Sequence, residues 1–227
     1  MPRAHARPER IGHRGAPREV TENTLEGFLR ALERGADAVE LDVHKTGDGV
    51  VVVHHDPDVA TTTRTHAPIT SLSWEEVSRC RLSAGLHIPT LAAVLDGVGD
   101  SAMVYIELKG EGVGEAAVAT AQAHGRRYAF HSFDHEAIRR LAARFPAIQR
   151  GVLFDSDIRD PIGALGGVDV RDIWAHRKLV SPALIDAVHE RGGRLIAWTV
   201  NERRLALRMA EQGADGICTD DVRILEP

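Results

Sequence analysis

The sequence has few cysteines, no long apolar stretch and no strong net charge, and each absence excludes a class of protein. Its two cysteines, Cys80 and Cys218, lie in different segments of the 227-residue chain, so they suggest neither a metal-binding pair nor a disulfide framework. No window approaches the roughly 18 apolar residues of a membrane-spanning helix. The net charge of -5 at pH 7, with the histidines neutral, gives no general attraction to nucleic acid or to an anionic membrane.

The first ten residues are polar and basic, and they lack the apolar segment of a signal peptide. Together with the sparse cysteines, this predicts a cytoplasmic protein without stable membrane association. A chain of this length accommodates one α/β barrel, and no repeat or low-complexity tract divides it. We therefore expect a single domain over residues 1–227, whose oligomeric state the sequence leaves open.

Strand and helix patterns alternate along most of the chain. A helix over residues 23–34, for example, is predicted with Thr21 or Asn23 as N-cap and Gly35 directly after its end. Strands are predicted at residues 11–13, 39–43, 103–108, 128–132, 151–154, 172–175, 194–200 and 216–218. Strands that alternate with helices in this way predict a (β/α)8 TIM barrel, in which functional side chains gather at the C-terminal strand ends. The chain ends soon after the last strand, so the eighth helix is expected to be missing or at most one turn.

The predicted strand at residues 39–43 carries two carboxylates on one face. Glu40 and Asp42 are separated by one residue, and strand side chains alternate between faces, so both project the same way. Ionised carboxylates this close repel each other unless they share a cation, a proton or a basic partner. On these residues alone, a strand with one solvated acidic face is the simpler interpretation. The polar residues elsewhere change that balance.

The segment Thr46-Gly47-Asp48-Gly49 predicts a hairpin that returns as a strand over residues 50–53. A turn centred between Gly47 and Asp48 would place His55 opposite Glu40. Residues 56–88 then interrupt the alternation, and we expect them to form an inserted lid segment after the second barrel strand.

In this arrangement, seven charged or titratable side chains lie at one mouth of the barrel. They are His13, Arg14, Glu40, Asp42, His55, Glu107 and Lys109. Three carboxylates with two cationic side chains suit a hard cation together with a phosphate, because oxygen ligands hold Mg²⁺ or Ca²⁺ and Arg or Lys holds phosphate oxygens. The two histidines are available for proton transfer near neutral pH. We therefore predict one divalent cation, Mg²⁺ or Ca²⁺.

Five motifs in order resemble the glycerophosphodiester phosphodiesterase family. They are His13-Arg14-Gly15 with Glu22-Asn23-Thr24, Glu40-Leu41-Asp42-Val43, His55-Asp56-Pro57, Glu107-Leu108-Lys109 and Trp198-Thr199-Val200-Asn201. Each motif alone is weak, but the series extends to Thr219-Asp220 and covers nearly the whole chain. The resemblance implies a metal-dependent hydrolase with a barrel fold. Thr21 replaces the family's usual proline, and His54 replaces its usual aromatic residue; we expect His54 to point away from the mouth.

The resemblance also implies roles for individual residues. Metal ligation is implied for Glu40, Asp42 and Glu107, acid-base catalysis for His13 and His55, phosphate contacts for Arg14 and Lys109, and a place in the pocket wall for Trp198. The residues themselves leave alternatives: Lys109 as an ion-pair partner of Glu107, and Trp198 as core packing. Glu22, His131 and Phe133 are expected to be wall or support.

The predicted function is hydrolysis of small glycerophosphodiesters, such as glycerophosphocholine or glycerophosphoethanolamine, to glycerol 3-phosphate and an alcohol. A lysophospholipase D of the same superfamily is an alternative, although residues 57–72 are mostly polar and favour a polar head group. A non-catalytic barrel that binds phosphate or metal would be expected to lack one of the two histidines. An isomerase or aldolase acting on a phosphosugar would not need three converging carboxylates.

Overall fold

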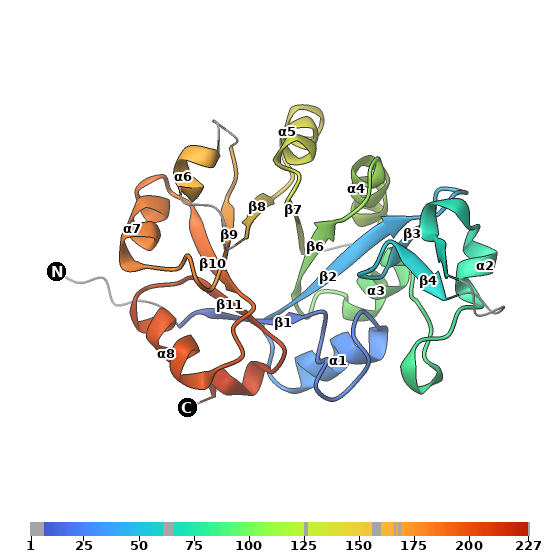
Figure 1. The fold of residues 1–227 in the computed structure, drawn as a ribbon, viewed down its shortest axis with the longest axis horizontal. Coiled ribbons are helices and arrows are strands. Elements are labelled where there is room, and N and C mark those ends of the chain that lie inside the picture. Colours follow the sequence, from blue (N-terminus) through green and yellow to red (C-terminus); the bar gives the residue numbers. More distant parts are fainter. Residues whose placement is uncertain are drawn as a thin grey trace.

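The computed structural model describes residues 7–60, 66–124, 127–155, 160–165, 167 and 169–226. Its centre is a closed barrel of parallel strands (Figure 1). Strand β1 (Glu9–His13) closes the barrel because it pairs with β2 (Ala38–Lys45) on one side and β11 (Gly216–Thr219) on the other. Between them follow β6 (Met103–Leu108), β7 (Tyr128–Ser132), β8 (Arg150–Phe154), β9 (Asp172–His176) and β10 (Arg194–Trp198). The predicted TIM barrel is confirmed.

Helices surround the barrel strands on the outside. They are α1 (Leu25–Glu33), α3 (Leu91–Val98), α4 (Val113–His124), α5 (His135–Arg144), α6 (Pro161–Ala164), α7 (Pro182–Glu190) and α8 (Arg203–Glu211). After β11 the described chain forms one 3-10 turn, η3 (Val222–Leu225). No helix in the described part of the chain is long and apolar enough to cross a membrane.

Helix α1 corrects one sequence prediction. Its N-cap is Thr24, whose hydroxyl accepts a hydrogen bond from the Gly27 N–H, and not Thr21 or Asn23. Asn23 has a positive φ of 55°, and its side-chain amide is turned into the barrel mouth. A tertiary contact therefore overrides the local capping preference of this asparagine.

The barrel interior is filled by side chains. Its apolar layer consists of Ile11, Ala38, Met103, Tyr105, Ala129, Leu153, Trp174, Ile196 and Cys218. Above Tyr105, the ring of Trp174 stacks on His131 with a centroid distance of 4.3 Å and an interplanar angle of 9°. This packed column is the floor on which the polar mouth rests.

The hairpin after β2 forms, but its register differs from the prediction by one residue. Strand β3 (Val51–Val53) pairs antiparallel with β2, and Val43 lies opposite Val53. The turn is centred on Asp48, because Gly49 has a φ of 92° and the Thr46 N–H donates to the Val50 carbonyl. The pairing of His55 with Glu40 was therefore wrong, and β3 ends before His55.

The segment after the hairpin forms a small substructure beside the barrel (Figure 1). It contains β4 (Asp58–Ala60), β5 (His66–Pro68), η1 (Ile69–Ser71), α2 (Trp74–Ser78) and η2 (Ser83–Gly85). A separate apolar cluster of Val52, Val59, Ile69, Val77, Cys80 and Ile88 packs beneath it. Part of the expected Thr-rich run, residues 61–65, lies outside the described residues, and the role of this segment as a lid stays a prediction.

Candidate active site

The strand register places the predicted acidic residues side by side at the C-terminal mouth. In the parallel sheet, His13 lies next to Glu40, and Asp42 lies next to Glu107. Glu107 in turn neighbours His131 on β7. Glu40, Asp42 and His131 are almost completely buried, and Glu107 is nearly so. Three strands therefore bring three carboxylates and an imidazole into one small volume.

Asp42 is held by two cationic side chains and an amide. Its Oδ2 lies 3.2 Å from Arg14 Nε and accepts a hydrogen bond of 2.9 Å from Asn23 Nδ2, while its Oδ1 lies 3.5 Å from Lys109 Nζ. Lys109 Nζ also donates to Glu107 Oε1 at 3.0 Å. Burial raises the pKa of Asp42, but the charges of Arg14 and Lys109 lower it by more, so the pKa lies below its usual value. Both predicted phosphate-contacting residues thus lie at the carboxylates, and the ion pair of Lys109 with Glu107 is present.

Glu40, Glu107 and His131 form the group with the geometry of a cation site. One ligand atom from each lies within 4.8 Å of the others. Burial, followed by the charge of Asp42, raises the pKa of Glu107 to about 7, because an ionised Glu107 is poorly solvated and faces other acids. His131 Nδ1 is buried without a hydrogen-bond partner among the described residues. These crowded donors fit a divalent cation, which would offset the repulsion between them.

His13 is oriented by an aspartate from the other end of the chain. Its Nδ1 lies 2.7 Å from Asp220 Oδ1, and Asp220 Oδ2 accepts a hydrogen bond of 2.6 Å from Asn201 Nδ2. The Asp220 N–H donates to Asn201 Oδ1, so Asn201 fixes both the backbone and the carboxylate of Asp220. Burial lowers the pKa of His13, but the hydrogen bond to Asp220 and the charge of Glu40 outweigh it and raise the pKa overall.

His55 also has an aspartate beside its Nδ1 atom, but its side chain is more exposed than that of His13. Its side chain is 34% exposed, and its Nδ1 lies 2.9 Å from Asp56 Oδ1. The backbone carbonyl of His55 accepts a hydrogen bond from His44 Nε2 at 3.1 Å, which fixes the chain after β3. In both His13 and His55 the Nδ1 atom faces a carboxylate. Nε2 is therefore the ring nitrogen left for proton transfer.

Aromatic side chains lie at the C-terminal ends of two barrel strands, β7 and β10. Trp198, at the end of β10, makes edge-to-face contacts with Phe133 and His176, at centroid distances of 5.5 Å and 5.4 Å. The buried Nε1 atom of Trp198 has no hydrogen-bond partner in the described structure. An indole N–H usually finds a partner when buried, so this donor suits a substrate oxygen. The sequence-based placement of Trp198 in the pocket wall stays a prediction.

Backbone strain also concentrates at this mouth. Arg14 and Asn23 have φ values of 54° and 55°, a region that non-glycine residues seldom adopt. The two are joined by a hydrogen bond of 3.0 Å from the Asn23 N–H to the Arg14 carbonyl. The Arg14 N–H donates to Glu40 Oε2, and its guanidinium pairs with Glu22 Oε1 at 3.0 Å. Strained residues held in this way are typical of functional sites.

The sequence predicts a supporting position for His131 and an N-cap role for Asn23, and it assigns no site role to Asp220, Asn201 or Asn23. Functional side chains of a barrel gather at the C-terminal strand ends. This rule also applies to Asp220, which follows β11, and to His131, which shares the inward face of β7 with the barrel core. Their contacts are across strands and invisible in local sequence. His54 is half-buried, and its backbone N–H donates to the Asp42 carbonyl.

Comparison with known proteins gives consistent results. Residues 13–224 match the sequence profile of the glycerophosphoryl diester phosphodiesterase family. A glycerophosphodiester phosphodiesterase of Caldanaerobacter subterraneus is 31% identical over 230 residues, which cover 95% of each chain. The crystal structure of a Thermotoga maritima glycerophosphodiester phosphodiesterase superposes with a TM-score of 0.82 at 27% identity and covers 97% of each chain.

A phosphodiesterase from Oleispira antarctica, solved in complex with the product sn-glycerol 3-phosphate, is similar with a TM-score of 0.86 at 25% identity. The match covers 96% of this chain and 95% of that one. The profile match spans the β1 end with His13, both acidic strands and the Trp198 segment, so it includes every residue predicted for the site. The chain therefore belongs to the glycerophosphoryl diester phosphodiesterase family, and it is a phosphoric diester hydrolase.

Proposed function

We propose that this enzyme hydrolyses glycerophosphodiesters, such as glycerophosphocholine and glycerophosphoethanolamine, to glycerol 3-phosphate and an alcohol. We also propose that the enzyme uses one divalent cation, Mg²⁺ or Ca²⁺, and that His13 and His55 act as its acid-base pair. The observation that carries it is the convergence of three buried carboxylates with Arg14 and Lys109 at one mouth. The sn-glycerol 3-phosphate in the Oleispira antarctica complex supports the product class.

The proposed ligands are Glu40, Asp42 and Glu107, with the buried imidazole of His131 close enough to contribute. When bound, a divalent cation supplies positive charge that stabilises the charge on the phosphoryl oxygens. Carboxylate oxygens bind both Mg²⁺ and Ca²⁺. Which of the two cations is preferred depends on the coordination number and the rigidity of the site.

The side chains of the protein hold the substrate and move the protons. Arg14 and Lys109 bind the phosphoryl oxygens and orient the diester. Nε2 of one histidine accepts the proton of the nucleophile, and Nε2 of the other donates a proton to the departing alcohol. Two nucleophiles suit this arrangement: water, and the neighbouring glycerol hydroxyl, which would give a cyclic phosphate that water then opens. Full-rate hydrolysis of a substrate without that hydroxyl would exclude the internal route.

The single domain over residues 1–227, the lid role of residues 56–88, the cytoplasmic location and the absence of nucleic-acid or stable membrane partners belong to the same proposal. Support for a small polar substrate comes from residues 57–72, which are mostly polar.

The test is release of glycerol 3-phosphate from both diesters, with and without chelator. We expect His13→Ala and His55→Ala each to lower kcat by about 10²- to 10⁴-fold, the usual range for loss of an acid-base group. His124→Ala is the matched control, because His124 also faces an aspartate, Asp96 at 3.1 Å, but lies on helix α4 away from the mouth.

Full activity in chelator would contradict the metal requirement, and activity retained by either mouth histidine variant would contradict the acid-base assignment. A wild-type enzyme that binds a divalent cation but hydrolyses neither diester would exclude these substrates and favour a lysophospholipid.

A further inference from the structure

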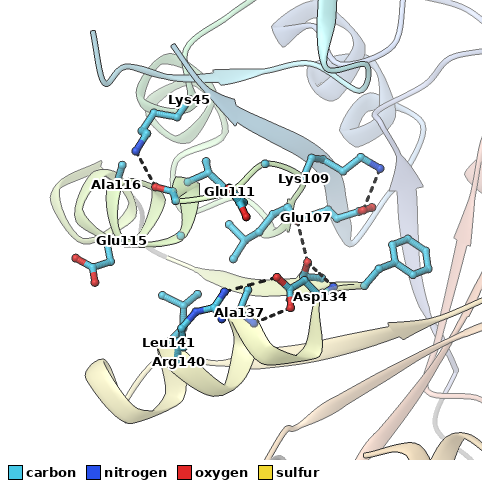
Figure 2. A pocket seen from close by; sticks show the side chains of 17 residues that line it. Lys45, Glu107, Lys109, Glu111, Glu115, Ala116, Asp134, Ala137, Arg140 and Leu141 are labelled. Atoms are coloured by element: carbon cyan, nitrogen blue, oxygen red, sulfur yellow. Dashed lines mark hydrogen bonds and ion pairs between the residues drawn. The ribbon is translucent and has the colours of Figure 1, made fainter. Parts of the chain in front are cut away.

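A cavity of about 730 Å³ adjoins the catalytic mouth between helices α4 and α5 (Figure 2). Its walls are the loop after β6, from Lys109 to Gly112, and the loop after β7, from Ser132 to Asp134. Glu107 and Lys109 line its inner end, so it begins where the phosphate is proposed to bind. Its volume lies within the range of small-molecule sites, roughly 300 to 1,000 Å³.

A phosphodiester carries two alcohol substituents, and both must leave the phosphate in different directions. The cavity provides room for one of them directly beside Lys109. Neither His13 nor His55 lines it, so only the ester oxygen at the phosphate, and not the rest of a substituent placed there, would have to reach a histidine.

Most charged side chains of the cavity wall already have partners (Figure 2). Lys109 binds Glu107 at 3.0 Å, Arg140 lies 3.6 Å from Asp134, and Lys45 Nζ donates to the Gly112 carbonyl at 2.9 Å. Glu115 lies 3.2 Å from Arg144.

Glu111 differs from these residues. It is exposed in the cavity wall, and no hydrogen bond or ion pair joins its side chain to another residue of the described structure. It thus offers a carboxylate that has no ion-pair partner among the described residues.

An exposed aromatic ring lies in the same wall. Phe133 is 44% exposed, unusually high for a large apolar side chain here, and Trp198 supports it from the side at 5.5 Å. An aromatic face combined with a free carboxylate attracts ammonium groups, through the ring quadrupole and through charge.

We propose that this cavity binds the leaving alcohol, and that Glu111 and Phe133 select amino alcohols with a positively charged nitrogen. This inference rests on the proposed function and specifies its substrate class. It assigns specificity to two residues outside the acid-base and metal groups.

The experiment compares kcat/KM for glycerophosphocholine with kcat/KM for glycerophosphoglycerol, whose alcohol substituent is uncharged. Wild type is expected to prefer the choline diester, and Glu111→Gln should lower the ratio of the two values about 5- to 10-fold, the size expected for one partly solvated carboxylate–ammonium contact. Phe133→Leu keeps an apolar side chain but removes the ring, and it should lower the same ratio.

Glu115→Gln is the matched control, because Glu115 lies in the same wall but pairs with Arg144; it should keep the wild-type ratio. An unchanged ratio in Glu111→Gln, or an equal fall in both glutamate variants, would overturn the inference while leaving the proposed function intact. A wild-type enzyme inactive on both diesters would overturn both.

Discussion

The two ends of the barrel both bury charged side chains, but they treat them differently. At the N-terminal base, fully buried Asp172 pairs with Arg171 at 2.5 Å and with Arg194 at 3.4 Å. Arg194 also binds Glu9 at 2.7 Å and donates to the Tyr105 hydroxyl, which itself donates to Glu9. Two acids face two arginines here, and each has hydrogen-bond partners. Burial still raises the pKa of Asp172 above its usual value, although the hydrogen bond and charge of Arg171 act against this rise.

At the C-terminal mouth, the charges are crowded instead of balanced. Glu107 faces Asp42 and Glu40, and its pKa is raised to about 7 by burial and by these acids. His131 Nδ1 and Trp198 Nε1 are buried without partners in the described structure. Buried charge whose partners are all present is compatible with a stable fold, whereas buried groups without partners indicate a place for a ligand.

The largest expected effect is at the base. Asp172→Asn should lower the free energy of unfolding by about 3 kcal/mol, because the half-buried Arg171 and Arg194 lose an ionised hydrogen-bond acceptor. Urea unfolding measures this change. The folded fraction should keep its kcat, since the base lies at the opposite end of the barrel from His13. A loss below about 1 kcal/mol would mean that the base network is not structural.

Most of the barrel could be predicted from the sequence, because local patterns determine most of it. The bounds of β6 and β7 were predicted without error, and α5 begins directly after Asp134, whose carboxylate caps it. The hairpin register was wrong because Thr46-Gly47-Asp48-Gly49 permits turns of two lengths, and only the backbone of Gly49 decides between them.

The site was predicted less completely, for a related reason. Residues on one strand, such as Glu40 and Asp42, share a face by alternation alone. By contrast, Asp220 meets His13 across 207 residues, because β1 and β11 become neighbours only when the barrel closes. The contact of His131 with Glu40 likewise depends on strands that are not adjacent in sequence.

The next effect concerns the pairing of Asp220 with His13. Asp220→Asn should lower kcat by about 10- to 100-fold, less than removal of His13, because the imidazole remains but loses its orientation. The pKa of His13 should fall, so the pH-rate limb that it controls should move to lower pH. Rate profiles from pH 5 to 9 measure both changes.

The pair also affects stability in a defined pH range. The raised pKa of His13 stabilises the fold below about pH 6.5, its unfolded value, and this contribution is lost as the pH rises through the folded value. The lowered pKa of Asp220 stabilises the fold above about pH 4 and is lost as the pH falls. Asp220→Asn should therefore cost most stability between these limits. Asp221→Asn is the control, since Asp221 binds Arg223 instead of His13. If this variant changed the pH dependence of stability equally, a specific role for Asp220 would be excluded.

The smallest effect has the opposite sign to that at the base. In chelator, Glu107→Gln should raise the free energy of unfolding at pH 8 by on the order of 1 kcal/mol, because it removes a buried carboxylate whose folded pKa lies above its unfolded value. A carboxyl shifted in this direction binds more protons when folded, so the wild type loses stability as the pH rises from about 4.5 to 7. The variant should lose less over that range and match the wild type near pH 4. Addition of Mg²⁺ or Ca²⁺ should stabilise the wild type more than the variant, which reverses their order. If Glu107→Gln were instead destabilised at pH 8, as Asp172→Asn is expected to be, then Lys109 would be satisfying Glu107 in the way that the arginines satisfy Asp172, and the two ends of the barrel would not differ in kind.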